Sequence, residues 1–130
     1  MDRRVAITGM GVISPIGNSV LEFWESLCAG KSGIDTITRF DVTDFSTKIG
    51  GCVENFDPEN YIEKKDARRM DKFTQYAIAA THMAIDDAAL EMDNIDKERL
   101  GVVLGTGVGG IETMEKQHER LMSRGPGRVS

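Results

Sequence analysis

The chain has 130 residues, 40% of them apolar, and a formal net charge of −5. A chain of this length makes one domain and can bury roughly two-thirds of its unfolded surface. The acidic balance argues against a dedicated nucleic-acid-binding protein, which needs a net basic face. No apolar run approaches the ~20 residues of a membrane span. Two cysteines without metal-ligand spacing favour a reducing, cytoplasmic setting and no metal site.

The first third of the chain has a strand, loop and helix pattern. Residues 5–8 are apolar and β-branched and end at a glycine, which predicts a buried strand. Ser19 and Glu22 form a capping box, and Gly30 is a natural helix terminator, so we predict a helix between them. Residues 31–47 have no period and are predicted to form a long loop.

The middle of the chain contains its longest helical period. Residues 49–53 predict a short strand. Asp57 and Pro58 predict the start of a helical turn, because Asp is a good N-cap and Pro suits the first helical position. Residues 66–92 then predict one long helix. Its stripe is rich in alanine, which indicates close packing against a sheet or another helix.

The last third repeats the alternation of strand and helix. Residues 100–104 predict a second buried strand, and residues 111–122 predict a helix that ends in a loop. Residues 105–110 lie between them and match the glycine pattern GxGxxG. The alternation indicates an α/β fold, although only two or three strands are present.

The glycine pattern has two interpretations. A strand before it and a helix after it are the context of a dinucleotide-binding loop. The acidic residue expected ~20 positions further on is missing, because the sequence there is Gly-Pro-Gly-Arg-Val-Ser. The favoured interpretation is that these glycines let two backbones approach or line a narrow pocket.

The candidate nucleophiles and bases are isolated from one another. Cys28 lies on the apolar stripe of the first predicted helix, which favours packing over catalysis. Cys52 has no histidine near it in the sequence. His82 lies within the long predicted helix, where a structural role is favoured, and His118 is expected on a solvated face. The chain therefore shows no catalytic constellation of its own.

A cluster of cations follows the predicted turn at Asp57. If this segment is helical, one face carries Lys65, Arg68, Arg69 and Lys72. One interpretation is a solvated face with internal ion pairs, since the cluster is interleaved with Glu63, Asp66 and Asp71. The other is a docking patch for an acidic partner, because a local patch of opposite sign gives specificity of encounter.

Several collinear motifs together resemble a known family. They are Arg4-Val5-Ala6-Ile7-Thr8-Gly9-Met10-Gly11-Val12-Ile13-Ser14-Pro15-Ile16-Gly17-Asn18, Trp24, Gly30-Lys31-Ser32-Gly33-Ile34, Arg69-Met70-Asp71, Gln75-Tyr76 and the glycine loop from Gly105 to Gly110. In this order they resemble the start of the beta-ketoacyl-[acyl carrier protein] synthases, most closely the synthase II branch. The resemblance covers all 130 residues.

The resemblance implies a fold and an activity. It implies an α/β, thiolase-like fold with αβαβα layers, of which residues 1–130 form part of the amino-terminal half, and a homodimer. Members of the family move an acyl group from acyl carrier protein to a cysteine. They then condense it with malonyl-carrier protein as carbon dioxide leaves. The expected partners are therefore acyl carrier protein and acyl and malonyl thioesters, with no cofactor, nucleic acid or membrane.

The resemblance also assigns roles to a few positions. It places the nucleophilic cysteine and its two histidines further along than this sequence reaches, so we expect the 130 residues alone to be inactive. The carrier-protein docking residues would be Lys65, Arg68, Arg69 and Arg128, with Arg124 as a secondary candidate. Gly107 and Val108 would line the acyl pocket.

Two alternatives remain at this point. One is a nicotinamide-dependent oxidoreductase that uses a glycine-rich loop. The other is a non-catalytic module that binds carrier protein through the basic cluster alone.

Overall fold

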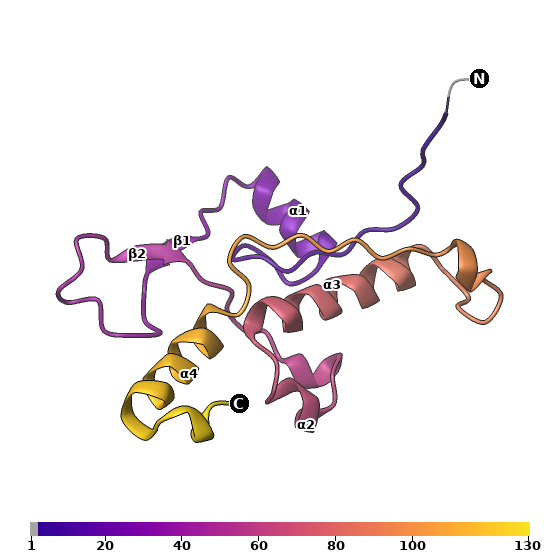
Figure 1. The fold of residues 1–130 in the computed structure, drawn as a ribbon. Helices are drawn as coiled ribbons and strands as arrows, with labels where there is room; N and C mark the ends of the chain where they lie inside the picture. The colour runs from indigo at the N-terminus through magenta and orange to yellow at the C-terminus, as the bar shows by residue number, and fades with distance from the viewer. Residues whose placement is uncertain (1–2) are drawn as a thin grey trace.

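A computed structural model describes residues 3–130 (Figure 1). Its helices and strands are few and short, and the longest element is α3. In chain order they are α1 (Val20–Cys28), β1 (Ile34–Thr36), β2 (Ile49–Gly51), η1 (Pro58–Asn60), α2 (Lys64–Ala67), α3 (Lys72–Asp87), η2 (Lys97–Arg99), α4 (Ile111–Arg124) and η3 (Pro126–Arg128), where η denotes a 3-10 helix.

Helix α1 forms where its capping residues predict it. The Ser19 hydroxyl accepts a hydrogen bond from the Glu22 backbone N–H at 3.2 Å. The Glu22 carboxylate in turn accepts one from the Asn18 backbone N–H at 2.9 Å. These bonds satisfy N–H groups that have no partner within the helix. Gly30 follows the helix with φ +66°, a conformation that glycine adopts without strain.

Strands β1 and β2 form a small antiparallel ladder. Ile34 is opposite Gly51, and Thr36 is opposite Ile49. The prediction of a strand at residues 49–53 is confirmed. The prediction of a continuous loop over residues 31–47 is wrong at β1, because three residues show no period of their own and become a strand only through their partner.

The predicted helix over residues 66–92 is instead two helices. Helix α2 ends at Ala67, Arg68 and Arg69 form a turn, and α3 begins at Lys72. Asp71 caps α3 with an extended backbone, at φ −67° and ψ 158°, which interrupts the helical path. The charge-rich sequence has helical periodicity on both sides of this break, so the pattern alone does not reveal it.

The alanine face of α3 packs against the segment that follows residue 8. A Cβ at Gly9 would overlap the Ala84 carbonyl oxygen, and a Cβ at Gly11 would overlap that of Ala80. The Met10 N–H donates to the Asp87 carboxylate at 2.8 Å. Figure 1 shows this indigo segment running along α3. The predicted close approach to the alanine stripe is present, but its partner is an extended segment that belongs to no sheet, rather than the expected sheet or helix.

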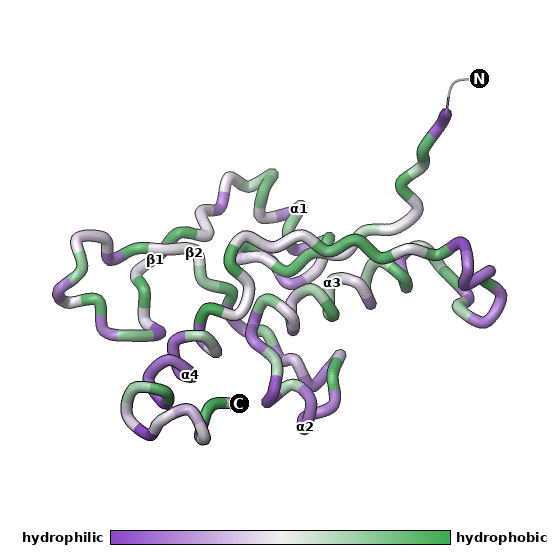
Figure 2. Tube along the Cα trace, in the orientation of Figure 1, coloured by the Kyte–Doolittle hydropathy of each residue, from purple (hydrophilic) through white to green (hydrophobic). Residues whose placement is uncertain are grey.

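The two strands predicted at residues 5–8 and 100–104 are not formed. A strand needs a hydrogen-bonded neighbour, and within residues 3–130 neither segment has one. Their side chains face solvent, with Val5 94% and Val103 99% exposed. Figure 2 marks both segments as largely hydrophobic.

Little apolar surface is buried across the described residues. The buried side chains are Ile62, Ala67, Gln75 and Ala79, all between η1 and the middle of α3. The accessible surface is 10922 Å². A compact monomer of 14.3 kDa would expose about 6,800 Å². The chain therefore leaves a large apolar area open to other contacts.

Candidate functional site

The cations of the predicted docking cluster are exposed on α2 and the turn after it. Lys65 lies within α2, Arg68 caps its C-terminal end and Arg69 follows in the turn. These three residues form the basic surface. Lys72 is also exposed, but it begins α3, so the expectation of one continuous helical face for all four cations is wrong.

The basic surface has no internal ion pairs. Among residues 3–130, one ion pair joins Lys64 Nζ to Glu59 Oε1 at 2.8 Å, and a second joins Lys116 to Glu112. Neither involves the basic surface. The interpretation of a self-neutralised face is therefore not supported, since no pair forms to the interleaved carboxylates Glu63, Asp66 and Asp71. The three charges are open to solvent or to an anionic partner.

The other predicted docking residues lie on separate elements. Arg124 is the last residue of α4, and Arg128 is the last residue of η3. Both side chains are exposed. The Ser130 N–H donates to Gln117 Oε1 at 2.8 Å, which ties this tail back to α4.

The glycine loop is open at its centre and constrained at its end. No atom lies within 4 Å of a Cβ built on Gly107, and Val108 is 69% exposed. Gly109 has φ +74°, and Gly110 is the N-cap of α4. A Cβ at Gly110 would overlap the Asp71 carboxylate. The last glycine therefore leaves room for the Asp71 side chain, which would have to move if a Cβ were present.

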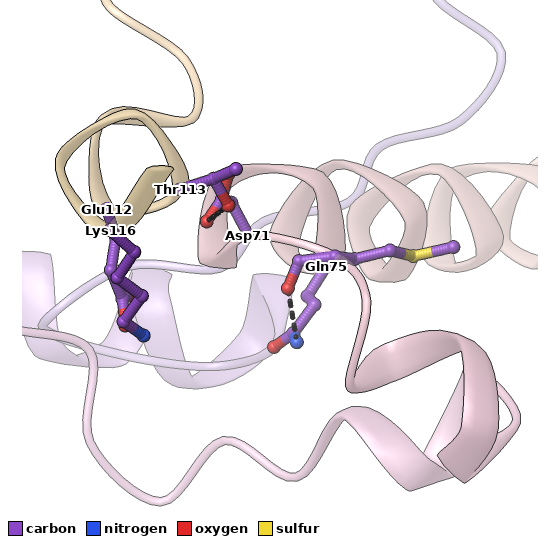
Figure 3. A network of polar contacts seen from close by, with 6 residues as sticks. Asp71, Gln75, Glu112, Thr113 and Lys116 are labelled. Carbon is purple, nitrogen blue, oxygen red and sulfur yellow. Dashed lines mark hydrogen bonds and ion pairs between the residues drawn. The ribbon is translucent and has the colours of Figure 1, made fainter. Parts of the chain in front are cut away.

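A carboxylate lies beside the start of the helix that follows the glycine loop. Asp71 Oδ1 accepts a hydrogen bond at 2.9 Å from the hydroxyl of Thr113, in the first turn of α4 (Figure 3). The start of a helix attracts anions, and the Asp71 carboxylate already lies beside this one, although it bonds the Thr113 hydroxyl and no backbone N–H of α4. A phosphate bound there would be repelled. This geometry disfavours the nicotinamide-dependent alternative.

No hydrogen bond joins a cysteine to a histidine within residues 3–130. Cys28 is exposed rather than packed, contrary to the prediction. His82 is also exposed, with its ring centroid 6.5 Å from that of Tyr61, and His118 is exposed as expected. In the described part of the chain, no group of three His, Cys, Asp or Glu side chains is placed to hold a metal ion.

A cavity beside α1 involves none of the predicted docking or acyl-pocket residues. It has a volume of about 840 Å³ and lies between α1 and the β1–β2 ladder. Its lining includes Cys52 and Lys31 but is dominated by acidic and neutral polar groups, and no histidine is among its lining residues in the described chain. Its charged carboxylates are Glu22, Glu25, Asp35 and Glu54. Sequence reasoning missed this cavity, because its walls come from several separate segments.

The shifted pKa values belong to exposed surface groups. A hydrogen bond from Lys116 lowers the pKa of the Glu112 carboxyl. A hydrogen bond to Glu59 raises the pKa of Lys64. These shifts come from surface partners and do not indicate a buried catalytic base.

None of the helices in residues 3–130 is long and apolar enough to cross a bilayer.

Comparison with curated proteins identifies closely similar relatives. The family described as "Beta-ketoacyl synthase, N-terminal domain" matches residues 2–129. The chain is 50% identical to 3-oxoacyl-[acyl-carrier-protein] synthase 2 of Vibrio cholerae over 128 residues, which are 98% of this chain and 31% of that protein. It is also 50% identical to the protein of the same name from Staphylococcus aureus over 129 residues, 99% of this chain and 31% of the relative. The chain thus spans about a third of the length of these relatives.

Solved structures with the same fold include two ketosynthases. The ishigamide ketosynthase/chain length factor matches with a TM-score of 0.83 and 37% identity, over 95% of this chain and 30% of that one. A type II PKS ketosynthase, solved in complex with its acyl-carrier protein, matches with a TM-score of 0.78 and 27% identity, over 99% of this chain and 33% of that one. The chain therefore forms part of an α/β, thiolase-like fold. The chain belongs to the beta-ketoacyl synthase family and corresponds to its N-terminal domain.

Proposed function

We propose that this chain is the amino-terminal part of a condensing enzyme that elongates fatty acids. The reaction transfers an acyl group from acyl carrier protein to an enzyme cysteine, and malonyl-carrier protein then loses carbon dioxide. The resulting carbanion forms the new carbon–carbon bond as the carbon–sulfur bond to the cysteine breaks. Support comes from 50% identity to 3-oxoacyl-[acyl-carrier-protein] synthase 2, with 31% of that protein covered. The rest of the enzyme would supply the cysteine and the histidines.

The role we propose for this stretch is carrier-protein docking. The observation that carries it is the basic surface, whose three cations are exposed and have no ion-pair partner within residues 3–130. A chain of net charge −5 that keeps such a patch unpaired has a local site for an acidic protein. Arg128, and secondarily Arg124, would extend this site from the other end of the chain.

The second proposed role is an acyl-chain channel beside the glycine loop. Gly107 has no side chain, and Val108 has a small one that is exposed. Both leave room for a flexible apolar tail once the rest of the enzyme encloses the loop. By resemblance we also propose that the full-length enzyme is a cytoplasmic homodimer without a cofactor.

Charge reversal tests the docking role. In the full-length enzyme, Lys65→Glu, Arg68→Glu and Arg69→Glu together should raise KM for acyl-carrier protein about tenfold or more. KM for a small acyl thioester should stay unchanged, because the surface steers the protein and never touches the reacting carbon. Steady-state kinetics with both substrates measures this difference.

A matched control separates docking from net charge. The control carries Lys48→Glu, Lys97→Glu and Arg99→Glu, which reverse three other exposed cations. It should leave both KM values near those of the wild type. If the control raises KM for the carrier protein equally, the effect is one of total charge and the docking role is wrong. Equal losses with both substrates in the first variant would indicate misfolding, which circular dichroism checks.

Binding to the isolated 130 residues tests the alternative of a separate binding module. The module would bind carrier protein tightly and reversibly without any further chain. The condensing-enzyme proposal instead expects weak binding here, because the basic surface is only part of the docking site. Titration calorimetry with the carrier protein distinguishes the two.

A further inference from the structure

Gln75 is the buried polar side chain of the described residues, with 6% of its surface exposed. It lies in the first turn of α3. Its amide nitrogen donates one hydrogen bond to the carbonyl oxygen of Ala67 at 2.8 Å and another to that of Met70 at 3.1 Å. Figure 3 shows this side chain beside the start of the helix.

The two carbonyls lie at either end of the turn that carries the basic surface. Ala67 is the last residue of α2, and Met70 is the first residue after Arg68 and Arg69. The final carbonyls of a helix have no partner within it and accept from elsewhere. The Ala67 carbonyl oxygen accepts from the Met70 N–H at 3.2 Å as well as from Gln75. Gln75 therefore fixes both ends of the Arg68–Arg69 dipeptide to α3 with a single side chain.

The burial of Gln75 has a cost that packing does not explain. Its second side-chain atom, Oε1, is buried without a hydrogen-bond partner in residues 3–130. An unpaired buried acceptor is destabilising, and a leucine of similar size would avoid it. The two bonds to the turn account for an amide at this position.

We propose that Gln75 is a positioning residue for the basic surface, which holds the turn so that Arg68 and Arg69 are presented together to an acidic partner. The inference rests on the proposed docking function. The backbone bonds from the Arg69 N–H to Asp66 and from the Met70 N–H to Ala67 close the turn but do not tie it to α3. Without the two Gln75 bonds, the closed turn would shift relative to α3, and binding would have to select among its positions. That selection lowers the apparent affinity in proportion to the population of the competent state.

The first test replaces the amide by an apolar group of similar size. In the full-length enzyme, Gln75→Leu removes both bonds to the turn and should raise KM for acyl-carrier protein about fivefold, because the binding-competent position of the turn becomes less populated. KM and kcat for a small acyl thioester should not change. Gln75→Met serves the same test with a flexible side chain if the leucine variant fails to fold.

A matched control removes another hydrogen bond at the start of the same helix. Thr113→Val deletes the hydroxyl that donates to Asp71 but leaves the turn at Arg68 and Arg69 untouched. It should leave KM for the carrier protein unchanged. If Thr113→Val raises this KM as much as Gln75→Leu does, the effect is a general loosening of α3 and the inference is wrong.

A combined variant separates this inference from the proposed function. In the background of the three charge reversals, Gln75→Leu should cause no further rise in KM, because there is no basic surface left to position. An additional fivefold rise would overturn the positioning role. If the charge reversals themselves leave KM unchanged, the docking function fails. If they raise KM but Gln75→Leu alone does not, only the present inference fails.

Discussion

Residues 57–82 and the two segments at 5–8 and 100–104 differ sharply in how they are held. The first region contains every buried side chain of the described residues, together with the Gln75 bonds that join α2 to α3. The two segments are richer in apolar and β-branched residues, yet Val102 is 85% and Ile7 83% exposed. The hydrophobicity of a segment therefore does not by itself decide whether its side chains are buried.

The difference is one of contact range. In residues 57–82 the bonds join residues a few positions apart, so the chain pays little entropy to close each loop. A buried strand gains nothing until a neighbour from elsewhere in the chain or another chain pairs with it. The two exposed segments have the composition of central strands and lack that neighbour within residues 3–130.

The largest expected effect is on the isolated 130 residues, because there the segments 5–8 and 100–104 have no strand neighbour. We expect them to self-associate or to be partly unfolded, because apolar patches of this extent are not left open in stable monomers. They should also fail to condense acyl and malonyl units, since no hydrogen bond joins a candidate nucleophile to a histidine in the described residues. Light scattering, amide hydrogen exchange and a condensation assay measure these properties.

Hydrogen exchange sharpens the contrast within one sample. Amides in the first half of α3 should exchange more slowly than those at residues 5–8 and 100–104. A monomer with a cooperative thermal transition and protected amides in both segments would contradict this account. Condensation activity that disappears on Cys52→Ala would show that the nucleophile lies within this chain.

The next largest effect concerns the loop that follows the second exposed segment. In the full-length enzyme, Val108→Phe should abolish the use of long acyl primers and preserve that of acetyl-length primers. Each buried methylene contributes ~0.8 kcal/mol, so excluding four of them costs about 3 kcal/mol. A primer-length series on both enzymes measures the change. A flat length profile, combined with saturable binding of a nicotinamide nucleotide, would overturn the proposed channel.

A smaller effect is expected where the two regions meet, along the alanine face of α3. Gly11→Ala places a Cβ against the Ala80 carbonyl oxygen, which is backbone and cannot rotate away. We expect the full-length enzyme to lose about 1–3 kcal/mol of unfolding free energy. Gly127→Ala is the control, because nothing lies within 4 Å of its Cβ and it lies on the exposed η3 rather than in a segment expected to pair. Equal stability losses in the two variants, measured by chemical denaturation, would mean that the close approach is not a constraint.

Local signals in the sequence predicted local structure well. The capping pair of Ser19 and Glu22 marks the start of α1, and Gly30 follows its end. The helix after the glycine loop is also predicted and forms as α4. Each of these depends on side chains within one or two turns of the backbone they satisfy, which a sequence pattern can represent.

Features that depend on distant partners were not predictable in the same way. The break between α2 and α3 involves Gln75, which reaches back to Ala67 across eight positions. The contact between Asp71 and Thr113 spans 42 positions and decides what the start of α4 can bind. The sequence predicted which cations form the basic surface. That they form no ion pairs within residues 3–130 could be seen only in the structure.

The most direct test of the docking claim is the salt dependence of KM for acyl-carrier protein. The ratio of KM between the variant with Lys65→Glu, Arg68→Glu and Arg69→Glu and the wild type should be largest at low salt. It should approach one near 1 M salt, where the Debye length is ~3 Å and exposed charges no longer act at a distance. A ratio that stays constant over this range would contradict the claim that these residues recognise the carrier protein through their charge.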